Sequence, residues 1–255
     1  MSISSASITR PVVVGVVGCG NISDIYLKNL TARPSVTVVA CADLLLERAK
    51  AKAAAHGVPR ACTVDELLAD PDVELVLNLT IPAAHAEVAL RAVESGKSVY
   101  NEKPLAIERA DARRLLDRAA ELGVKVGGAP DTFLGAGLQT CRRLIDEGVI
   151  GTPVAFTAAM LSHGPEGWHP DPAFFYLKGA GPLFDMGPYY LTALVTLLGP
   201  IARVSAGVRA SFPTRRVTSE PGPERDVPVE VATHVAATLE SVSYTHLTLP
   251  TKRIV

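Results

Sequence analysis

Apolar and polar residues alternate in two regular ways between residues 11 and 127. Short runs rich in Val, Leu and Ala predict buried strands, and apolar positions recur at helical spacing in the segments between them, such as 47–56 and 108–122. Strands that alternate with helices through short, right-handed connections are typical of a parallel sheet covered on both faces. The pattern predicts an α/β Rossmann domain, a doubly wound parallel sheet, with strands at 11–17, 36–42, 73–79, 97–101 and 124–127.

A glycine-rich turn follows directly on the first apolar run. Gly18 permits a tight turn, and Gly20 has no Cβ that would keep the backbone away from a pyrophosphate. A helix that starts near Asn21 and Ile22 would point its first N–H groups and its positive end at phosphates. We therefore expect these four residues to bind a dinucleotide.

An acidic residue, Asp43, ends the second apolar run, 23 residues after Gly20. A carboxylate at this point can accept hydrogen bonds from the hydroxyls of the adenosine ribose. It would repel a 2′-phosphate, and the segment 44–46 that follows consists of leucines and offers no basic side chain to receive one. The sequence thus predicts NAD rather than NADP.

The third apolar run leads into a segment that contains Thr80, Pro82 and His85. Ligands of open α/β sheets bind outside the carboxyl ends of the strands, so Thr80, Pro82 and His85 are candidate cofactor contacts. For His85 a second interpretation is equally open, in which the ring only hydrogen-bonds backbone near the start of a helix.

Four segments of the chain resemble the glucose-fructose oxidoreductase / inositol dehydrogenase / rhizopine catabolism (Gfo/Idh/MocA) family over about residues 11–240. The segments are 18–22 (Gly-Cys-Gly-Asn-Ile), 80–85 (Thr-Ile-Pro-Ala-Ala-His), 95–106 (containing Asn-Glu-Lys-Pro-Leu-Ala) and 144–151 (Leu-Ile-Asp-Glu-Gly-Val-Ile-Gly). The resemblance implies a nicotinamide dinucleotide cofactor and a second, α+β domain with a mostly antiparallel sheet. In the family this domain shapes the substrate pocket and often the oligomer interface, so we expect a homo-oligomer for the full-length protein.

The Glu102-Lys103-Pro104 segment is the most specific of these motifs. The resemblance implies that Lys103 touches both nicotinamide and substrate, that Glu102 belongs to the cofactor site, and that the Lys103–Pro104 peptide bond is cis.

Beyond residue 128 the pattern changes, which predicts domains at 1–127 and 128–241. The second domain is expected to contain a helix at 133–147, a strand at 153–161, and strands at 201–212 and 229–240 around a polar, Pro-rich loop. Residues 242–255 resemble the translation of a sequencing adaptor, so we treat them as a non-native tail and expect the second domain to be incomplete.

Asp185 and Tyr189 lie four residues apart in a predicted helix, so they should share one face. The family typically has Asp-x-Gly-x-His here, and Tyr189 stands at the histidine position. We expect Tyr189 to act as the base, with the Lys103 ammonium favouring tyrosinate, while Asp185 pairs with Lys103 or binds a substrate hydroxyl. The alternatives are that Tyr189 packs in the core and that His169 is the base.

The loop 162–176 contains the only Trp, together with His163, His169 and Asp171. These residues lack the spacing of metal ligands, and the four cysteines are scattered without a Cys-x-x-Cys motif. We therefore predict no metal site, and we expect the cysteines to be reduced core residues.

The net charge of −1 and the pI of about 6.6 give no basic field, which argues against nucleic acid and anionic membranes as partners. No apolar stretch approaches the roughly 18 residues of a membrane span, and the first ten residues do not look like a signal peptide, so we expect a cytoplasmic protein. These observations and the resemblance predict an NAD-dependent oxidoreductase that interconverts a secondary alcohol and a ketone on a sugar, cyclitol or related polyol. Two alternatives remain open, namely glycoside cleavage or elimination through transient oxidation, and a non-catalytic dinucleotide-binding sensor.

Overall fold

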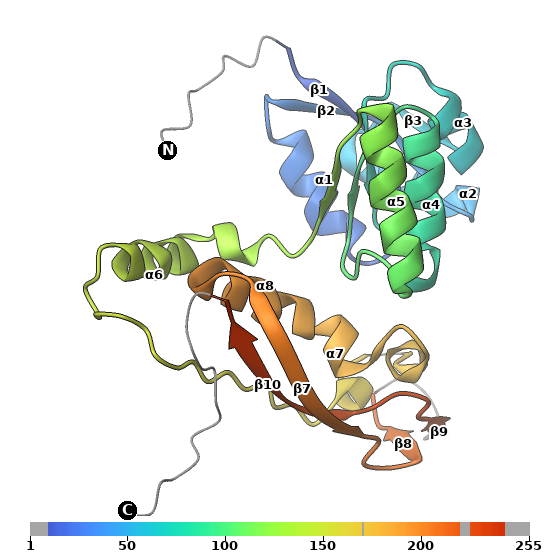
Figure 1. Cartoon of the computed structure of the whole chain (residues 1–255). Helices are drawn as coiled ribbons and strands as arrows, with labels where there is room; N and C mark the ends of the chain where they lie inside the picture. Colours follow the sequence, from blue (N-terminus) through green and yellow to red (C-terminus); the bar gives the residue numbers. More distant parts are fainter. Residues whose placement is uncertain (1–9, 170, 220–224, 243–255) are drawn as a thin grey trace, which may run out of the picture. The chain divides into compact units, whose positions relative to one another are not determined.

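A computed structural model describes residues 10–169, 171–219 and 225–242 of the chain (Figure 1). The chain divides into two units at Ala129/Pro130. The predicted tail lies outside the described residues, apart from Val242.

The first unit contains a six-stranded parallel sheet with the strand order β3-β2-β1-β4-β5-β6. All five predicted strands are confirmed, with shifts of one or two residues at some ends. Sequence reasoning missed β3, which has only three residues. The strands are β1 (Val12–Val17), β2 (Val36–Ala42), β3 (Arg60–Cys62), β4 (Leu75–Asn78), β5 (Ser98–Asn101) and β6 (Val126–Gly128).

Five helices connect these strands. The helix α3 begins with a capping box, in which the Thr63 hydroxyl accepts from the Glu66 N–H and the Glu66 carboxylate accepts from the Thr63 N–H. The strand order reverses direction between β1 and β4, which is the point where open α/β sheets bind ligands. The helices are α1 (Ser23–Thr31), α2 (Leu46–His56), α3 (Val64–Ala69), α4 (Pro82–Glu94) and α5 (Arg109–Leu122).

Alternate side chains of β1 pack into two different apolar clusters. Val17 belongs to a cluster with Leu115 of α5, whereas Val16 belongs to one with Leu27 of α1. All four side chains are at most 1% exposed. Both faces of the sheet are therefore covered, as expected for a doubly wound fold.

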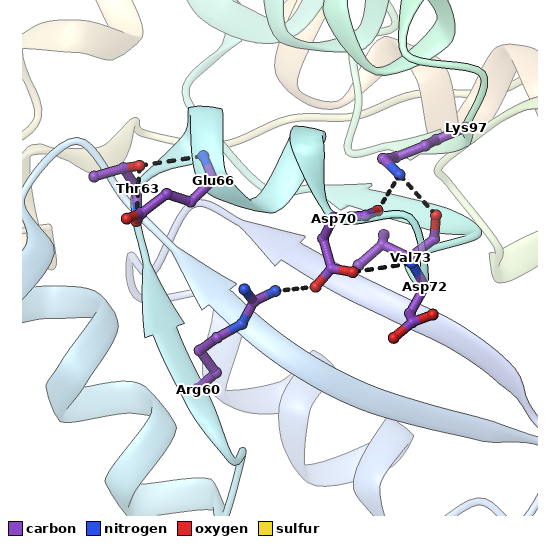
Figure 2. A network of polar contacts seen from close by, with 7 residues as sticks. All are labelled: Arg60, Thr63, Glu66, Asp70, Asp72, Val73 and Lys97. Atoms are coloured by element: carbon purple, nitrogen blue, oxygen red, sulfur yellow. Dashed lines mark hydrogen bonds and ion pairs between the residues drawn. The ribbon is translucent and has the colours of Figure 1, made fainter.

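A polar network lies at the amino ends of the strands (Figure 2). The Lys97 ammonium is buried and donates to the carbonyl oxygens of Asp70 at 2.5 Å and Val73 at 3.0 Å. The Asp70 carboxylate forms an ion pair with Arg60 and accepts from the N–H of Asp72 at 2.9 Å. Burial lowers the pKa of Lys97. Because ligands bind at the opposite edge of the sheet, this network braces the turn between α3 and β4 and has no part in the candidate site.

The second unit combines helices with two small antiparallel sheets. One of its apolar clusters joins the buried residues Leu194, Leu197 and Leu198 of α8 to partly buried side chains of β7, β10 and α6. The helices are α6 (Ala136–Asp146), α7 (Gly181–Asp185) and α8 (Gly187–Leu198), with 3₁₀ turns η1 (Thr132–Leu134), η2 (Pro165–Gly167) and η3 (Ala173–Tyr176). The strands are β7 (Ile201–Arg209), β8 (Thr214–Val217), β9 (Arg225–Pro228) and β10 (His234–Ser241).

Three expectations for this unit are wrong in detail. The segment 153–161 forms no strand, and none of the described strands pairs with it. The predicted Pro-rich loop contains β8 and β9, which pair with each other, and the last strand begins only at His234. The helix expected to carry both Asp185 and Tyr189 is interrupted at Met186, because Pro188 has no N–H to continue the ladder.

Candidate functional site

The glycine turn brings the backbone of β1 against the end of β4. Gly18 has a φ of +99°, and a Cβ there would lie 2.5 Å from the carbonyl carbon of Leu79, so only glycine fits. A Cβ on Gly20 would meet nothing within 4 Å, which leaves open space above the turn. Beside this space α1 begins, and no side chain caps its first turn at Ile22. The backbone near Asn21 thus fits an anion such as a pyrophosphate.

Asp43 is hydrogen-bonded to the same turn. One carboxylate oxygen accepts from the N–H of Cys19 at 2.7 Å, and the other accepts from the N–H of Leu45 at 2.9 Å. These bonds fix the carboxylate beyond the end of β2. Each oxygen still has a lone pair to offer to a ribose hydroxyl.

Exposed apolar side chains surround this edge of the sheet. Ile22 was predicted from the sequence as a cofactor-binding residue, whereas Leu44 and Ile81 were not. Leu44 is 95% exposed, Ile81 is 67% exposed and Ile22 is 46% exposed. A large apolar residue shortly after a strand end was the signal that could have found Leu44 and Ile81. Their exposure in a unit with an otherwise well-buried core fits the burial of flat cofactor rings.

The loop after β4 is held by a buried network of amides. Asn78 is fully buried, and its side-chain oxygen accepts from the hydroxyl of Thr80 at 2.7 Å. Its amide group donates to Asn101 Oδ1 and to the carbonyl oxygen of His85, both at 3.0 Å. Thr80 and Pro82 are half-buried at the surface of this loop.

The ring of His85 lies inside the protein and is 1% exposed. Its Nδ1 lies 2.6 Å from the carbonyl oxygen of Pro104, and its Nε2 lies 2.9 Å from the carbonyl oxygen of Thr80. Both ring nitrogens are therefore engaged with backbone, which is the second of the two interpretations considered for His85.

Glu102 and Lys103 follow β5 at the same edge. The Tyr26 hydroxyl of α1 donates to Glu102 Oε1 at 2.7 Å, and the N–H of Lys103 donates to Glu102 Oε2 at 2.8 Å. The Lys103–Pro104 bond is cis, as the resemblance implied. Sequence reasoning did not identify the role of Tyr26.

The second unit contains a pocket of about 610 Å³ that is lined mainly by apolar and aromatic side chains. Asp185 lines it, as do Trp168 and Tyr190, whereas Tyr189 is not among the lining residues. The ring of Trp168 is 67% exposed. The volume lies in the range of small-molecule sites, about 300–1,000 Å³.

His169 packs among aromatic rings beside this pocket. Its ring contacts Trp168, Phe174 and Phe175 at centroid distances of 5.3–5.5 Å. Its Nδ1 accepts from the N–H of Asp171 at 3.0 Å, so only Nε2 of the neutral ring carries a proton.

A buried ion pair supports the wall of the pocket. Glu166 is 1% exposed and pairs with Arg215, which also donates to the carbonyl oxygen of His163. Burial works to raise the pKa of Glu166, but hydrogen bonds from Tyr176 and Arg215 prevail and lower it. Burial and the Glu166 carboxylate raise the pKa of Tyr176. Through these two contacts Arg215 fixes the segment 163–166. Removing either partner of the ion pair would leave the other charge buried and unpaired, which is costly.

The described residues contain no group of three or more His, Cys, Asp or Glu side chains placed to hold a metal ion. Cys19, Cys41 and Cys62 are buried free thiols, as expected, whereas Cys141 is exposed. Among the described helices, none has the length and apolar character needed to cross a bilayer.

Comparison with known proteins gives two family matches. Residues 12–128 match the model described as "Oxidoreductase family, NAD-binding Rossmann fold", and residues 138–254 match "GFO/IDH/MocA C-terminal domain".

Curated relatives include the 1,5-anhydro-D-fructose reductase of Ensifer adhaerens, 34% identical over 60% of this chain and 47% of that protein. Inositol 2-dehydrogenase 3 of Saccharopolyspora erythraea is 34% identical over 55% of this chain and 42% of its own length. The chain thus spans about half the length of these two relatives.

Solved structures agree with the fold. An NAD binding oxidoreductase from Klebsiella pneumoniae superposes with a TM-score of 0.77 at 26% identity, covering 92% of this chain and 65% of that one. Levoglucosan dehydrogenase in complex with NADH and L-sorbose gives a TM-score of 0.75 at 21% identity, covering 92% and 65%.

Proposed function

Because this chain belongs to the Gfo/Idh/MocA family of NAD-binding oxidoreductases, we propose that it is a dehydrogenase that interconverts a secondary alcohol and a ketone on a sugar, cyclitol or related polyol. The observation that carries the proposal is that the glycine turn, Asp43 and the loop 102–108 lie at the same edge of the parallel sheet. We call the segment 102–108 the Lys103 loop. Bound nicotinamide would accept or give the hydride at its C4.

The residues of the first unit fit that cofactor. The backbone of Gly18, Gly20 and the start of α1 holds the pyrophosphate, and Asp43 accepts hydrogen bonds from the ribose hydroxyls. Thr80, Pro82 and Glu102 border the same edge. We propose NAD over NADP because a 2′-phosphate beside Asp43 would bring two negative charges together.

We propose that residues of both units bind the substrate and transfer its proton. Lys103 touches the substrate oxygen and stabilises the charge that develops there, and Asp185 binds a substrate hydroxyl. Tyr189 accepts the hydroxyl proton, with His169 as the rival base. The interruption of the helix at Met186 places Asp185 and Tyr189 on separate helices, so the argument that they share one face no longer supports this assignment.

The pocket of the second unit supports a sugar or polyol as the substrate. The C–H face of a sugar ring is apolar and packs on an aromatic ring, and the exposed Trp168 indole offers such a surface. The Asp185 carboxylate offers acceptors for hydroxyl groups. An apolar wall with a few polar groups is typical of small-molecule sites.

The test is a panel of sugars, cyclitols and their ketones assayed with NAD or NADH. Stoichiometric change of cofactor with substrate supports the dehydrogenase. Turnover that needs only catalytic NAD and yields a cleaved or eliminated product identifies the transient-oxidation alternative. Tight NAD binding without turnover on the whole panel supports a sensor, the alternative suggested by tyrosine in place of the family histidine.

A further inference from the structure

We propose that Tyr26 and His85 are positioning residues that hold the Lys103 loop from its two sides. The inference rests on the proposed function, in which Lys103 touches the substrate. Neither side chain has a role at the reacting atoms, since each acts through a neighbour of Lys103 in the chain.

The first hold acts through Glu102, which precedes Lys103. Its two carboxylate oxygens take different donors, the Tyr26 hydroxyl at 2.7 Å and the N–H of Lys103 at 2.8 Å. The N–H of Glu102 donates to the carbonyl oxygen of Asn78 at 2.9 Å. Hydrogen bonds to a charged acceptor are among the stronger ones in proteins. Glu102 therefore ties α1, which begins at the glycine turn, to the backbone of Lys103.

The second hold acts through Pro104, which follows Lys103. The His85 ring lies between the carbonyl oxygens of Pro104 and Thr80. A carbonyl oxygen only accepts, so a neutral ring, with one N–H, can donate to one of them, and a doubly protonated ring donates to both. In either state, moving the loop away would leave a buried ring nitrogen or carbonyl oxygen without its partner, which is costly. The ring therefore fixes the loop against β4 and α4.

Buried amides complete this arrangement. Asn101 donates to the carbonyl oxygen of Leu105 at 3.1 Å and accepts from Asn78 at 3.0 Å. Both amide side chains are fully buried. Hydrogen bonds thus join the glycine turn, the loop after β4 that contains Thr80, and the Lys103 loop into one network. This network determines where the Lys103 backbone lies.

The position of Lys103 should affect the rate of the reaction. A displacement of about 1 Å of a group that orients substrate can lower the rate about a hundredfold without touching the reacting atoms. Cofactor binding depends mainly on the glycine turn and Asp43, so it should survive a loss of either hold. The expected signature is a fall in kcat with little change in the Kd for NAD.

The experiment uses the full chain and the variants Tyr26→Phe and His85→Gln. Tyr26→Phe removes only a hydroxyl, and His85→Gln keeps one donor. We expect kcat to fall about ten- to a hundredfold in each, with the Kd for NAD changed less than about threefold. Lys103 labelling by pyridoxal phosphate and borohydride, measured by mass spectrometry at saturating NAD, should change in rate in both variants. This readout needs no turnover, so it tests the holds even if the dehydrogenase assignment fails.

Lys97→Met is the matched control, because Lys97 is a buried polar residue of the same unit at the opposite edge of the sheet. It should change thermal stability but neither kcat nor the labelling rate. A double-mutant cycle of Tyr26→Phe with Glu102→Gln should be strongly non-additive if Tyr26 acts through Glu102.

Three results would overturn the proposal. Wild-type labelling rates in both variants would show that the Lys103 loop does not depend on them. A rise in the Kd for NAD that accounts for the whole loss of activity would make them cofactor-binding residues instead. Additive effects in the Tyr26/Glu102 cycle would contradict the first hold, and Tyr26→Phe keeps this test decisive if His85→Gln does not fold.

Discussion

The carboxylate of Asp43 accepts a hydrogen bond from the N–H of Cys19 at 2.7 Å. The acid at the end of β2 and the glycine turn after β1 are therefore one structural feature, although 24 residues separate them. A charge held this rigidly cannot turn away from a ligand that repels it. This rigidity leads to the first prediction.

Asp43 should make the protein bind NAD at least about tenfold more tightly than NADP, because like charges brought together in a binding site cost several kcal/mol. Asp43→Ala should relax the preference by weakening NAD and strengthening NADP. The measurement is the Kd for each dinucleotide by calorimetry. Equal or tighter binding of NADP by the wild type would contradict the assignment of Asp43.

Tyr189→Phe should lower kcat by about two to four decades, because it removes the proposed base and keeps the ring. Binding of NAD should stay intact. The comparison includes His169→Ala and Tyr190→Phe, since His169 is the rival base and Tyr190, the neighbour of Tyr189 in α8, lines the pocket. If either of these variants loses activity while Tyr189→Phe keeps it, the base has been assigned to the wrong residue.

The folding pattern of the first unit could be predicted because its signals are local. Val-rich runs and a glycine turn act through nearby backbone, and the acid stands at a fixed separation from that turn. The contact between Tyr26 and Glu102 could not, because these residues are 76 positions apart and nothing in α1 singles out Tyr26.

The second unit was harder to predict for a related physical reason. An extended segment becomes a strand only where a partner accepts its hydrogen bonds, and sequence pattern does not show the partner. For this reason 153–161 was wrongly predicted as a strand, and β8 and β9 were missed between prolines. The break between Asp185 and Tyr189, by contrast, could have been predicted from the sequence, because Pro188 lacks the N–H that a continuous helix needs.

Trp168 should report substrate binding directly, because it is the only Trp in the chain and its exposed ring lines the pocket. We expect a polyol substrate to change its fluorescence in a saturable way. Trp168→Ala should raise KM about tenfold, which corresponds to about 1.4 kcal/mol, with a smaller effect on kcat. Phe174→Ala is the control, since Phe174 is an exposed ring of the same segment that is not among the pocket-lining residues. An unchanged KM in Trp168→Ala would show that the indole is not part of the substrate site.

Glu74 should make the first unit sensitive to acid. A hydrogen bond from the Arg10 guanidinium, together with the N–H of Val13, lowers the pKa of Glu74 to about 2 from its usual 4.5. The folded state therefore binds fewer protons than the unfolded state between these values, so the stabilisation is present above about pH 4.5 and is lost as the pH falls toward 2. Glu74→Gln should lower the urea midpoint at pH 6, and its difference from the wild type should shrink as the pH falls from about 5 to about 3. Glu121→Gln removes an exposed carboxylate that pairs with Arg118 on α5, and it should shift the midpoint little at any pH. A constant difference between wild type and Glu74→Gln across this range would show that the protonation of Glu74 is not linked to folding.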